Sequence, residues 1–431
     1  MEIMRKSWET AGRPKRVAAA VSGGADSMAM LIALEAAAQE EGFFLCAVQV
    51  DHGLRPDSGQ DAEFVENFCR ERAIPCQVKR VQVAGKGENG AREARYEALF
   101  SFCRDMGADA LALAHHRRDQ AETLLLHLFR GSGGVGLSGM PEWQERCLPD
   151  GKPIGLWRPF LDVSPQMLRK ALLEKQIPWR EDSTNGESLY LRNFLRLEIM
   201  PPIETRLPGA EAAMARAAEI FRDEQDYFRQ EAEKFLLLHG WREAPFCFAD
   251  GEALDGLHIA VKRHAVRLLC PVPLNHEETE AVAALKRGQT ANLSRGFRAY
   301  RTEKRLHFLP KEGKAPSMGN LLELPFRGET GDGIFLQAVP KSLLEGCELR
   351  FRRPGDRIHP LGAKGEKSLQ DYWTDKKIDA PFREHLPLLC KGNKVLWSIG
   401  VGPGEEARIH EGENILLLKY DGALPPIKMK K

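Results

Sequence analysis

VAAAVSGGADSMAMLIALEAAA, residues 17–38, is the segment from which the fold can be predicted. Its apolar residues 17–21 predict a short β-strand, and the apolar run over residues 28–38 predicts a long helix. Between them, Gly23 and Gly24 permit a tight turn and a close approach of the backbone to a ligand. A turn that begins a helix offers free backbone N–H groups and the positive end of the helix dipole. The segment therefore predicts an anion-binding loop.

The loop itself consists of Ser22, Gly23, Gly24, Ala25, Asp26 and Ser27. The carboxylate of Asp26 would repel a phosphate, which suggests that Mg²⁺ lies between the two charges. The string lacks the lysine of G-x-x-x-x-G-K-[ST], and a capped turn without a ligand is the alternative. SGGADS resembles the PP-loop of the ATP pyrophosphatases. That resemblance implies ATP binding by these residues, cleavage between the α- and β-phosphates, and transfer of AMP to an oxygen atom.

The composition is that of a globular protein with two or three domains. The chain has 431 residues and a formal net charge of +1, which excludes a surface that is basic throughout. Its nine cysteines include no C-x-x-C pair, so we expect neither zinc nor an iron–sulfur cluster. No apolar run of membrane-spanning length and no signal peptide are apparent, so we expect a cytoplasmic protein without a membrane partner. The oligomeric state is left open, a homodimer included.

Residues 17–115 alternate between strand and helix patterns. Strands are predicted over 43–50, 76–83 and 110–114, and helices over 62–73 and 91–106. Such alternation predicts a parallel sheet with helices on both faces, and ligands bind such sheets beyond the carboxyl ends of the strands. Asp51 and His52 follow the second strand and would face the same crevice as the loop. A turn cap and a solvated loop residue are equally good interpretations of these two residues.

Polar residues also gather in AHHRRDQAETLLLHLFRGSGGVGLSGM, residues 114–140. Asp119 and Glu122 are three residues apart, so they share one face of a helix that begins beside the crevice. Acidic side chains are also favoured in a first helical turn without any further role. His115 and His116 are suited to contact phosphate or to polarise a substrate, and their spacing does not indicate a metal site.

Several motifs together resemble the tRNA(Ile)-lysidine synthase family of the PP-loop group. They are DHGLR, AHHxxDQAET, RGSGxxGLxGM, RPFL, EDSTN and RNxxR, in that order between residues 16 and 200. In one departure, Arg118 stands where the family usually has an acidic residue before Asp119. This departure puts the role of position 118 in doubt, whereas Asp119 and Glu122 match the family.

The resemblance implies a set of site residues. ATP is expected to bind residues 22–27 with Asp51 and His52, and Asp26 is expected to hold Mg²⁺. The expected catalytic residues are Asp26, His115, His116 and Asp119. Asp119 is the candidate base, and Glu122 with Asp119 is expected to bind the ammonium group of lysine. The other residues expected in the substrate crevice are Arg92, Arg95, Asp182, Asn185, Arg192 and Arg196.

The predicted fold is α/β, with three domains. Residues 1–205 are expected to form a parallel-sheet PP-loop ATPase domain, 206–315 a helical linker and small central domain, and 321–431 a β-rich C-terminal domain. From residue 350 to 394, eleven Lys or Arg accompany six Asp or Glu, with Tyr372, Trp373 and Phe382 interleaved. This pattern suits RNA binding, and a solvated surface above core aromatics is the alternative. The expected tRNA contacts are Arg352, Arg353, Lys376 and Lys377.

The function implied by the resemblance is ATP-dependent ligation of L-lysine to C2 of cytidine 34 in the CAU-anticodon isoleucine tRNA. The cofactors and partners implied are ATP, Mg²⁺, L-lysine and that tRNA. Two alternatives stay open. One is another PP-loop enzyme such as a tRNA thiolase, although the scattered cysteines lack the spacing of a cluster. The other is a nucleotide- or RNA-binding protein without catalytic activity.

Overall fold

The computed structural model describes residues 2–51, 58–81, 87–148, 150–181, 191–243, 246–311, 318–328 and 331–425. The chain divides into two compact units, Met1–Asp226 and Tyr227–Lys431. Helix α10 (Ala210–His239) runs through the boundary between them. In the part of the chain described, no helix is both long and apolar enough to cross a membrane.

The first unit is built on a six-stranded sheet in the order β3-β2-β1-β4-β6-β5. Its strands are β1 (Arg16–Ala20), β2 (Phe44–Asp51), β3 (Cys76–Arg80), β4 (Ala110–Ala112), β5 (Trp143–Cys147) and β6 (Pro153–Trp157). The pairings among β1, β2, β3, β4 and β6 are parallel, and β5 is an antiparallel edge strand paired with β6. The predicted parallel sheet is therefore confirmed, and its antiparallel edge is an addition.

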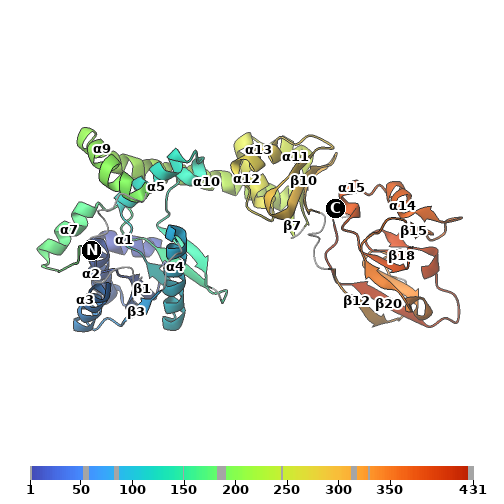
Figure 1. Cartoon of the computed structure of the whole chain (residues 1–431), viewed down its shortest axis with the longest axis horizontal. Helices are drawn as coiled ribbons and strands as arrows, with labels where there is room; N and C mark the ends of the chain where they lie inside the picture. Colours follow the sequence, from blue (N-terminus) through green and yellow to red (C-terminus); the bar gives the residue numbers. More distant parts are fainter. Residues whose placement is uncertain are drawn as a thin grey trace. The chain divides into compact units, whose positions relative to one another are not determined.

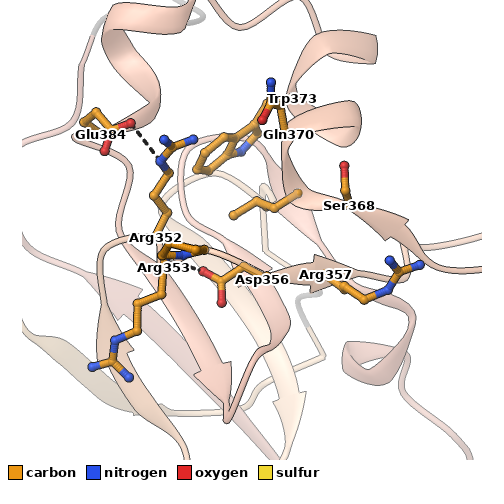
Figure 2. Close-up of a pocket in the computed structure, with 11 residues that line it drawn as sticks. Arg352, Arg353, Asp356, Arg357, Ser368, Gln370, Trp373 and Glu384 are labelled. Carbon is orange, nitrogen blue, oxygen red and sulfur yellow. Dashed lines mark hydrogen bonds and ion pairs between the residues drawn. The ribbon is translucent and has the colours of Figure 1, made fainter.

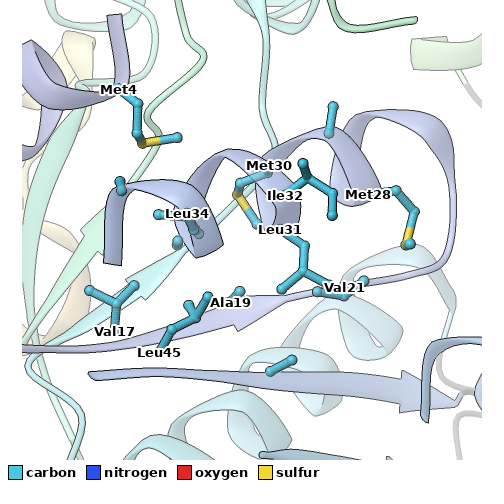
Figure 3. Close-up of a cluster of buried hydrophobic side chains, with 14 of the residues drawn as sticks. Met4, Val17, Ala19, Val21, Met28, Met30, Leu31, Ile32, Leu34 and Leu45 are labelled. Atoms are coloured by element: carbon cyan, nitrogen blue, oxygen red, sulfur yellow. The ribbon is translucent and has the colours of Figure 1, made fainter. Parts of the chain in front are cut away.

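Helices cover both faces of this sheet, and the side chains of β1 point alternately to one face and to the other. Val17 and Ala19 face α2 (Ala25–Glu41), where Met28, Leu31 and Leu34 are fully buried (Figure 3). Ala18 and Ala20 pack instead against α4 (Gly87–Met106) on the other face. In Figure 1, α2 and α4 accordingly lie on either side of β1. The remaining covering helices are α1 (Glu2–Thr10), α3 (Ser58–Glu71) and α7 (Pro165–Glu174).

A second group of helices comes from two parts of the chain, one between β4 and β5 and one after α7. It comprises α5 (Arg117–Phe129), α6 (Gly134–Leu137), α8 (Leu191–Phe194), the π-helix Leu195–Ile199, α9 (Met200–Arg206) and α10. Ala121 and Leu125 of α5 form a small core with Leu195 and Met200. This core fixes α5 beside the segment that carries Arg192 and Arg196.

The second unit contains three antiparallel or mixed sheets. The first has the order β7-β8-β11-β10-β9 and lies with α11 (Gly251–Asp255), α12 (Ile259–Leu269) and α13 (His276–Ala283). Its strands are β7 (Gly240–Glu243), β8 (Phe246–Asp250), β9 (Thr290–Asn292), β10 (Phe297–Arg301) and β11 (Arg305–Pro310). The expected helical region is thus present in α10–α13, and a five-stranded sheet accompanies it.

The remaining two sheets make the C-terminal part β-rich, as predicted. A three-stranded sheet contains β12 (Leu321–Pro325), β13 (Leu336–Pro340) and β20 (Ile415–Tyr420). A six-stranded sheet contains β14 (Glu348–Arg350), β15 (Arg357–Ile358), β16 (Lys367–Ser368), β17 (Leu388–Lys391), β18 (Lys394–Ser398) and β19 (Gly402–Pro403). Two short helices, α14 (Leu369–Asp375) and α15 (Ala380–Arg383), pack on the larger sheet through Trp373 and Phe382.

Candidate active site

The predicted glycine loop connects β1 to α2, and its own side chains hold it together. Gly23 has φ +86°, a conformation that favours glycine. The hydroxyl of Ser27 donates to the carbonyl of Gly24 at 2.9 Å and accepts from the backbone N–H of Ser22 at 3.1 Å. A side chain on Gly23 would also meet Val65 of α3 at 3.4 Å. The loop is therefore a fixed turn that directs its backbone toward the cavity in front of α2.

A cavity of about 340 Å³ lies at the carboxyl end of β1 and β4, where ligands bind in sheets of this kind. The loop contributes Ser22, Gly24, Ala25, Asp26 and Ser27, and the end of β4 contributes Leu113, Ala114 and His115. Its charged lining residues are Arg95, Arg169, Arg180, Arg196, Asp61, Glu181 and Asp26. The arginines outnumber the carboxylates, which suits a polyphosphate.

His116 connects the glycine loop to α5. Its Nε2 lies 3.5 Å from Asp26 Oδ2, and its Nδ1 lies 3.3 Å from Asp119 Oδ2. The same oxygen of Asp119 accepts the backbone N–H of His116 at 2.9 Å, which caps the start of α5. Burial lowers the pKa of His116, but the hydrogen bond with Asp26 and the charge of Asp119 outweigh it, so the pKa is raised overall. His116 is therefore suited to bear a positive charge between the two carboxylates.

Asp119 and Glu122 share one face of α5, as predicted, and both contact arginines. Arg196 donates to Asp119 Oδ1 at 2.8 Å and to Glu122 Oε1 at 2.7 Å. Arg192 donates to Glu122 Oε2 at 2.9 Å, and its Nη2 lies 3.3 Å from Asp119 Oδ1. Burial raises the pKa of Asp119, but His116 and the two arginines lower it by more than burial raises it. The pKa is therefore lowered overall, and the carboxyl stays ionised. Glu122 is fully buried, so this network holds a charge that water does not reach.

His115 lines the cavity in its neutral form. Burial is the main cause that lowers the pKa of His115 to about 3. Its Nδ1 is buried and has no hydrogen-bond partner among the described residues. A neutral imidazole can exchange a hydrogen bond with a substrate but cannot supply a positive charge to a phosphate. Of the two roles expected for His115, the structure therefore favours polarising a substrate.

Asp26 has the properties of a single metal ligand. Its Oδ1 is buried and accepts no hydrogen bond from the described part of the chain. No group of three or more described His, Cys, Asp or Glu residues is arranged to hold a metal ion. Mg²⁺ is commonly held by one or two carboxylates together with substrate phosphates. The donor set around Asp26 fits that kind of site.

Other predicted residues lie farther from the cavity or outside the described residues. Asp51 is buried at the end of β2, 3.8 Å from Arg80 Nε, and does not line the cavity. Arg92 lies over the ring of Tyr96, at 5.4 Å from its centroid, and is not a lining residue either. The predicted His52, Asp182 and Asn185 lie outside the described residues.

Sequence reasoning missed four charged residues of the cavity, namely Asp61, Arg169, Arg180 and Glu181. The backbone N–H of Arg180 donates to the carbonyl of Gly23 at 2.9 Å, and its Nε donates to Asp61 Oδ1 at 3.0 Å. Arg169 of α7 lies beside them, 3.8 Å from Glu181. Two of them, Arg180 and Glu181, lie in or directly before the motif EDSTN, residues 181–185, of which the resemblance assigns only Asp182 and Asn185 to the substrate crevice.

The C-terminal part contains a second, larger cavity of about 600 Å³ (Figure 2). Arg352, Arg353 and Arg357 line it. Beneath them, Arg350 donates to both oxygens of Asp356 at 2.7 and 2.9 Å, and both side chains are buried. Asp356 also accepts the backbone N–H of Arg353 at 2.7 Å, so this ion pair fixes the loop that carries the arginines.

The aromatic residues near this cavity belong mainly to the core. Tyr372, Trp373 and Phe382 are at most 3% exposed, which is the arrangement given above as the alternative to stacking platforms. Lys376 lies over the ring of Tyr372, 5.6 Å from its centroid, and Lys377, two residues beyond the end of α14, has φ +56°. Neither lysine lines the cavity, whereas Arg352 and Arg353 both do.

Comparisons with known proteins identify the family of the chain. Residues 3–203 match the PP-loop domain family, and residues 347–418 match the TilS substrate C-terminal domain. A tRNA(Ile)-lysidine synthase of Geobacter sulfurreducens is 30% identical, over 93% of this chain and 92% of that protein. One of Porphyromonas gingivalis is 31% identical, over 94% of each chain. The chain therefore belongs to the tRNA(Ile)-lysidine synthase family.

Proposed function

We propose that this chain ligates L-lysine to C2 of cytidine 34 in the CAU-anticodon isoleucine tRNA, in a reaction that converts ATP to AMP and pyrophosphate. The observation that carries the proposal is the chain of contacts from Asp26 on the glycine loop, through His116, to Asp119 on α5. It links the loop that would hold ATP to the carboxylates that would receive lysine. The reaction is assigned to the cytoplasm, where its tRNA substrate is found.

In the first step, the O2 atom of cytidine attacks the α-phosphorus of ATP and pyrophosphate leaves. The phosphates lie against the backbone of the loop at the start of α2, near Arg169 and Arg180. Asp26 would hold Mg²⁺, which supplies positive charge for the phosphate oxygens. Positioning and charge stabilisation account for most of the catalysis in such a transfer. His115 would donate or accept a hydrogen bond at the base.

In the second step, the ε-amine of lysine attacks C2, and AMP leaves with the former O2 atom. The lysine ammonium has a pKa of about 10.4, so it must lose a proton before it can attack. We assign the acceptance of that proton to Asp119 and the binding of the ammonium to Glu122. Arg192 and Arg196 contact both carboxylates, so lysine must displace part of this network. Because such exchange places the amine beside the activated carbon, proximity adds to the rate.

The C-terminal cavity is assigned to the tRNA. Arg352 and Arg353 carry guanidinium groups suited to paired contacts with phosphate oxygens, and Lys376 and Lys377 would add point charges nearby. Arg352 is 2.7 Å from Glu384, and Arg353 is 2.6 Å from Glu348. RNA phosphates would compete with these carboxylates, so we expect binding to weaken steeply as salt rises.

A tRNA thiolase is the less favoured alternative. Such an enzyme needs a reactive cysteine or a cluster near the nucleotide. Among the described residues, those that line the cavity beside the glycine loop include no cysteine. The contacts of His116 with Asp26 and Asp119 have a direct use in an amine ligation.

The proposal is tested with purified protein, α-labelled ATP, Mg²⁺, labelled lysine and a CAU-anticodon tRNA transcript. We expect AMP release and lysine incorporation in equal amounts, and neither with a transcript whose position 34 is uridine. Asp26→Asn should abolish AMP release, and Asp119→Asn should reduce lysine incorporation more than tRNA adenylation. AMP release without lysine incorporation would overturn the ligase assignment, and the absence of both products would leave only a binding protein.

A further inference from the structure

Arg118 lies in the first turn of α5, next to Asp119, but its side chain is directed elsewhere. Its Nε donates to Glu211 Oε1 at 2.6 Å, in the first turn of α10. The side chain of Arg118 is 28% exposed and that of Glu211 is 8% exposed. Arg118 is not among the residues that line the cavity. The residue at the position where the family usually has an acid therefore contacts a buried acid instead.

The partner of Arg118 is held in place on its other side. The backbone N–H of Glu211 donates to Glu204 Oε2 at 3.0 Å, and that of Gly209 donates to Glu204 Oε1 at 2.7 Å. These backbone hydrogen bonds lower the pKa of Glu204, which keeps the carboxylate charged and bound to the turn. The turn between α9 and α10 is thus fixed at the point that Arg118 reaches.

The segment from Arg192 to Glu211 makes three kinds of contact with α5. Arg192 and Arg196 contact the carboxylates of α5, and Leu195 packs on its apolar side. Glu211 adds a contact of the opposite polarity, with an arginine of α5 rather than a carboxylate. The Arg118 contact lies in the first turn of α5, at the residue next to Asp119 in the chain.

We propose that Arg118 is a positioning residue whose ion pair with Glu211 holds the first turn of α5, and with it Asp119, in register with Asp26. A buried carboxylate that loses its partner is unfavourable, so each member of the pair requires the other. A cation at this position cannot bind Mg²⁺ or an ammonium, so its contribution to the reaction is made through Asp119 and His116. The kinetic part of this inference rests on the proposed function.

The test compares wild type with Arg118→Met, Glu211→Gln and the charge-swapped pair Arg118→Glu with Glu211→Arg. Arg229→Met is the matched control, because Arg229 forms an exposed ion pair with Glu233 on the same helix α10. Two quantities are measured for each protein. One is kcat and KM for ATP in the complete tRNA reaction, and the other is the Tm of unfolding.

We expect kcat to fall about tenfold in each single variant, with KM for ATP within about twofold, and the charge swap to restore kcat to within about threefold. The control should match wild type in both quantities. A rise in KM for ATP, or a folded charge-swapped protein without recovered kcat, would overturn the inference, as would a lower Tm with unchanged kcat. If wild type itself incorporates no lysine, the proposed function fails, whereas the ion pair is still tested by whether the charge swap regains the Tm lost in the single variants.

Discussion

Replacement of Arg196 with methionine removes one of the two arginines that contact both carboxylates of α5. Arg196 donates to Asp119 at 2.8 Å and to the two oxygens of Glu122 at 2.7 and 3.0 Å. Breaking a buried ion pair costs about 3–5 kcal/mol. The side chain is 27% exposed, and Arg192 keeps its contact with Glu122 at 2.9 Å, so part of that cost is avoided. We expect a loss of about 2–3 kcal/mol, or about 4–12 °C in the Tm of a unit of this size.

The pH dependence of this loss gives the sharper test. The pKa of Asp119 lies below its ordinary value of 3.8, so its stabilising contribution is present above about pH 4 and is lost as the pH falls through the folded pKa. Without Arg196 that pKa rises. The difference in Tm between variant and wild type should therefore be largest near neutral pH and should shrink below about pH 4. Arg216→Met, on an exposed part of α10, serves as the control. A loss below about 0.5 kcal/mol, or one that is independent of pH, would refute this reasoning.

Three further perturbations have defined outcomes. His116→Asn should lower the free energy of unfolding, followed through Tm, by about 1 kcal/mol at pH values below the ordinary histidine pKa of 6.5. The deficit should vanish as the pH rises through the raised pKa of His116, because the charged ring supplies the stability. An equal deficit at all pH values would contradict this. Gly155→Ala places a Cβ 1.8 Å from Trp143, so the first unit should lose at least about 1–3 kcal/mol in denaturant unfolding, and a neutral result would contradict the packing. Arg350→Met leaves Asp356 buried without its arginine partner, so the free energy of unfolding of the second unit should fall by about 3 kcal/mol. The tRNA affinity should also fall in a filter-binding assay, with KM for ATP unchanged. A change in that KM would argue against separate sites.

The sheet and the glycine loop could be predicted because their signals are local. Strand periodicity, the apolar run of β2 and the pair Gly23–Gly24 each depend on neighbouring residues only. The shared face of Asp119 and Glu122 follows from helical spacing in the same way. These features needed no information about which distant segments meet.

The contacts between distant segments could not be predicted. The resemblance implies only that Arg192 and Arg196 lie in the substrate crevice and does not indicate their partners. The structure pairs both with Glu122, which lies 70 residues from Arg192 and 74 residues from Arg196 in the chain. Their helix is also partly a π-helix, Leu195–Ile199, which no spacing rule indicated.

The most direct test of the central claim is mass spectrometry of the nucleosides from a CAU-anticodon isoleucine tRNA transcript treated with the protein, ATP, Mg²⁺ and lysine. The account predicts that cytidine 34 alone gains the mass of one lysine less one water, because the O2 atom departs with AMP and the lysine nitrogen replaces it. Isotope-labelled lysine should shift that mass by the full label. An unmodified cytidine 34, or a product that contains sulfur in place of lysine, would contradict the account.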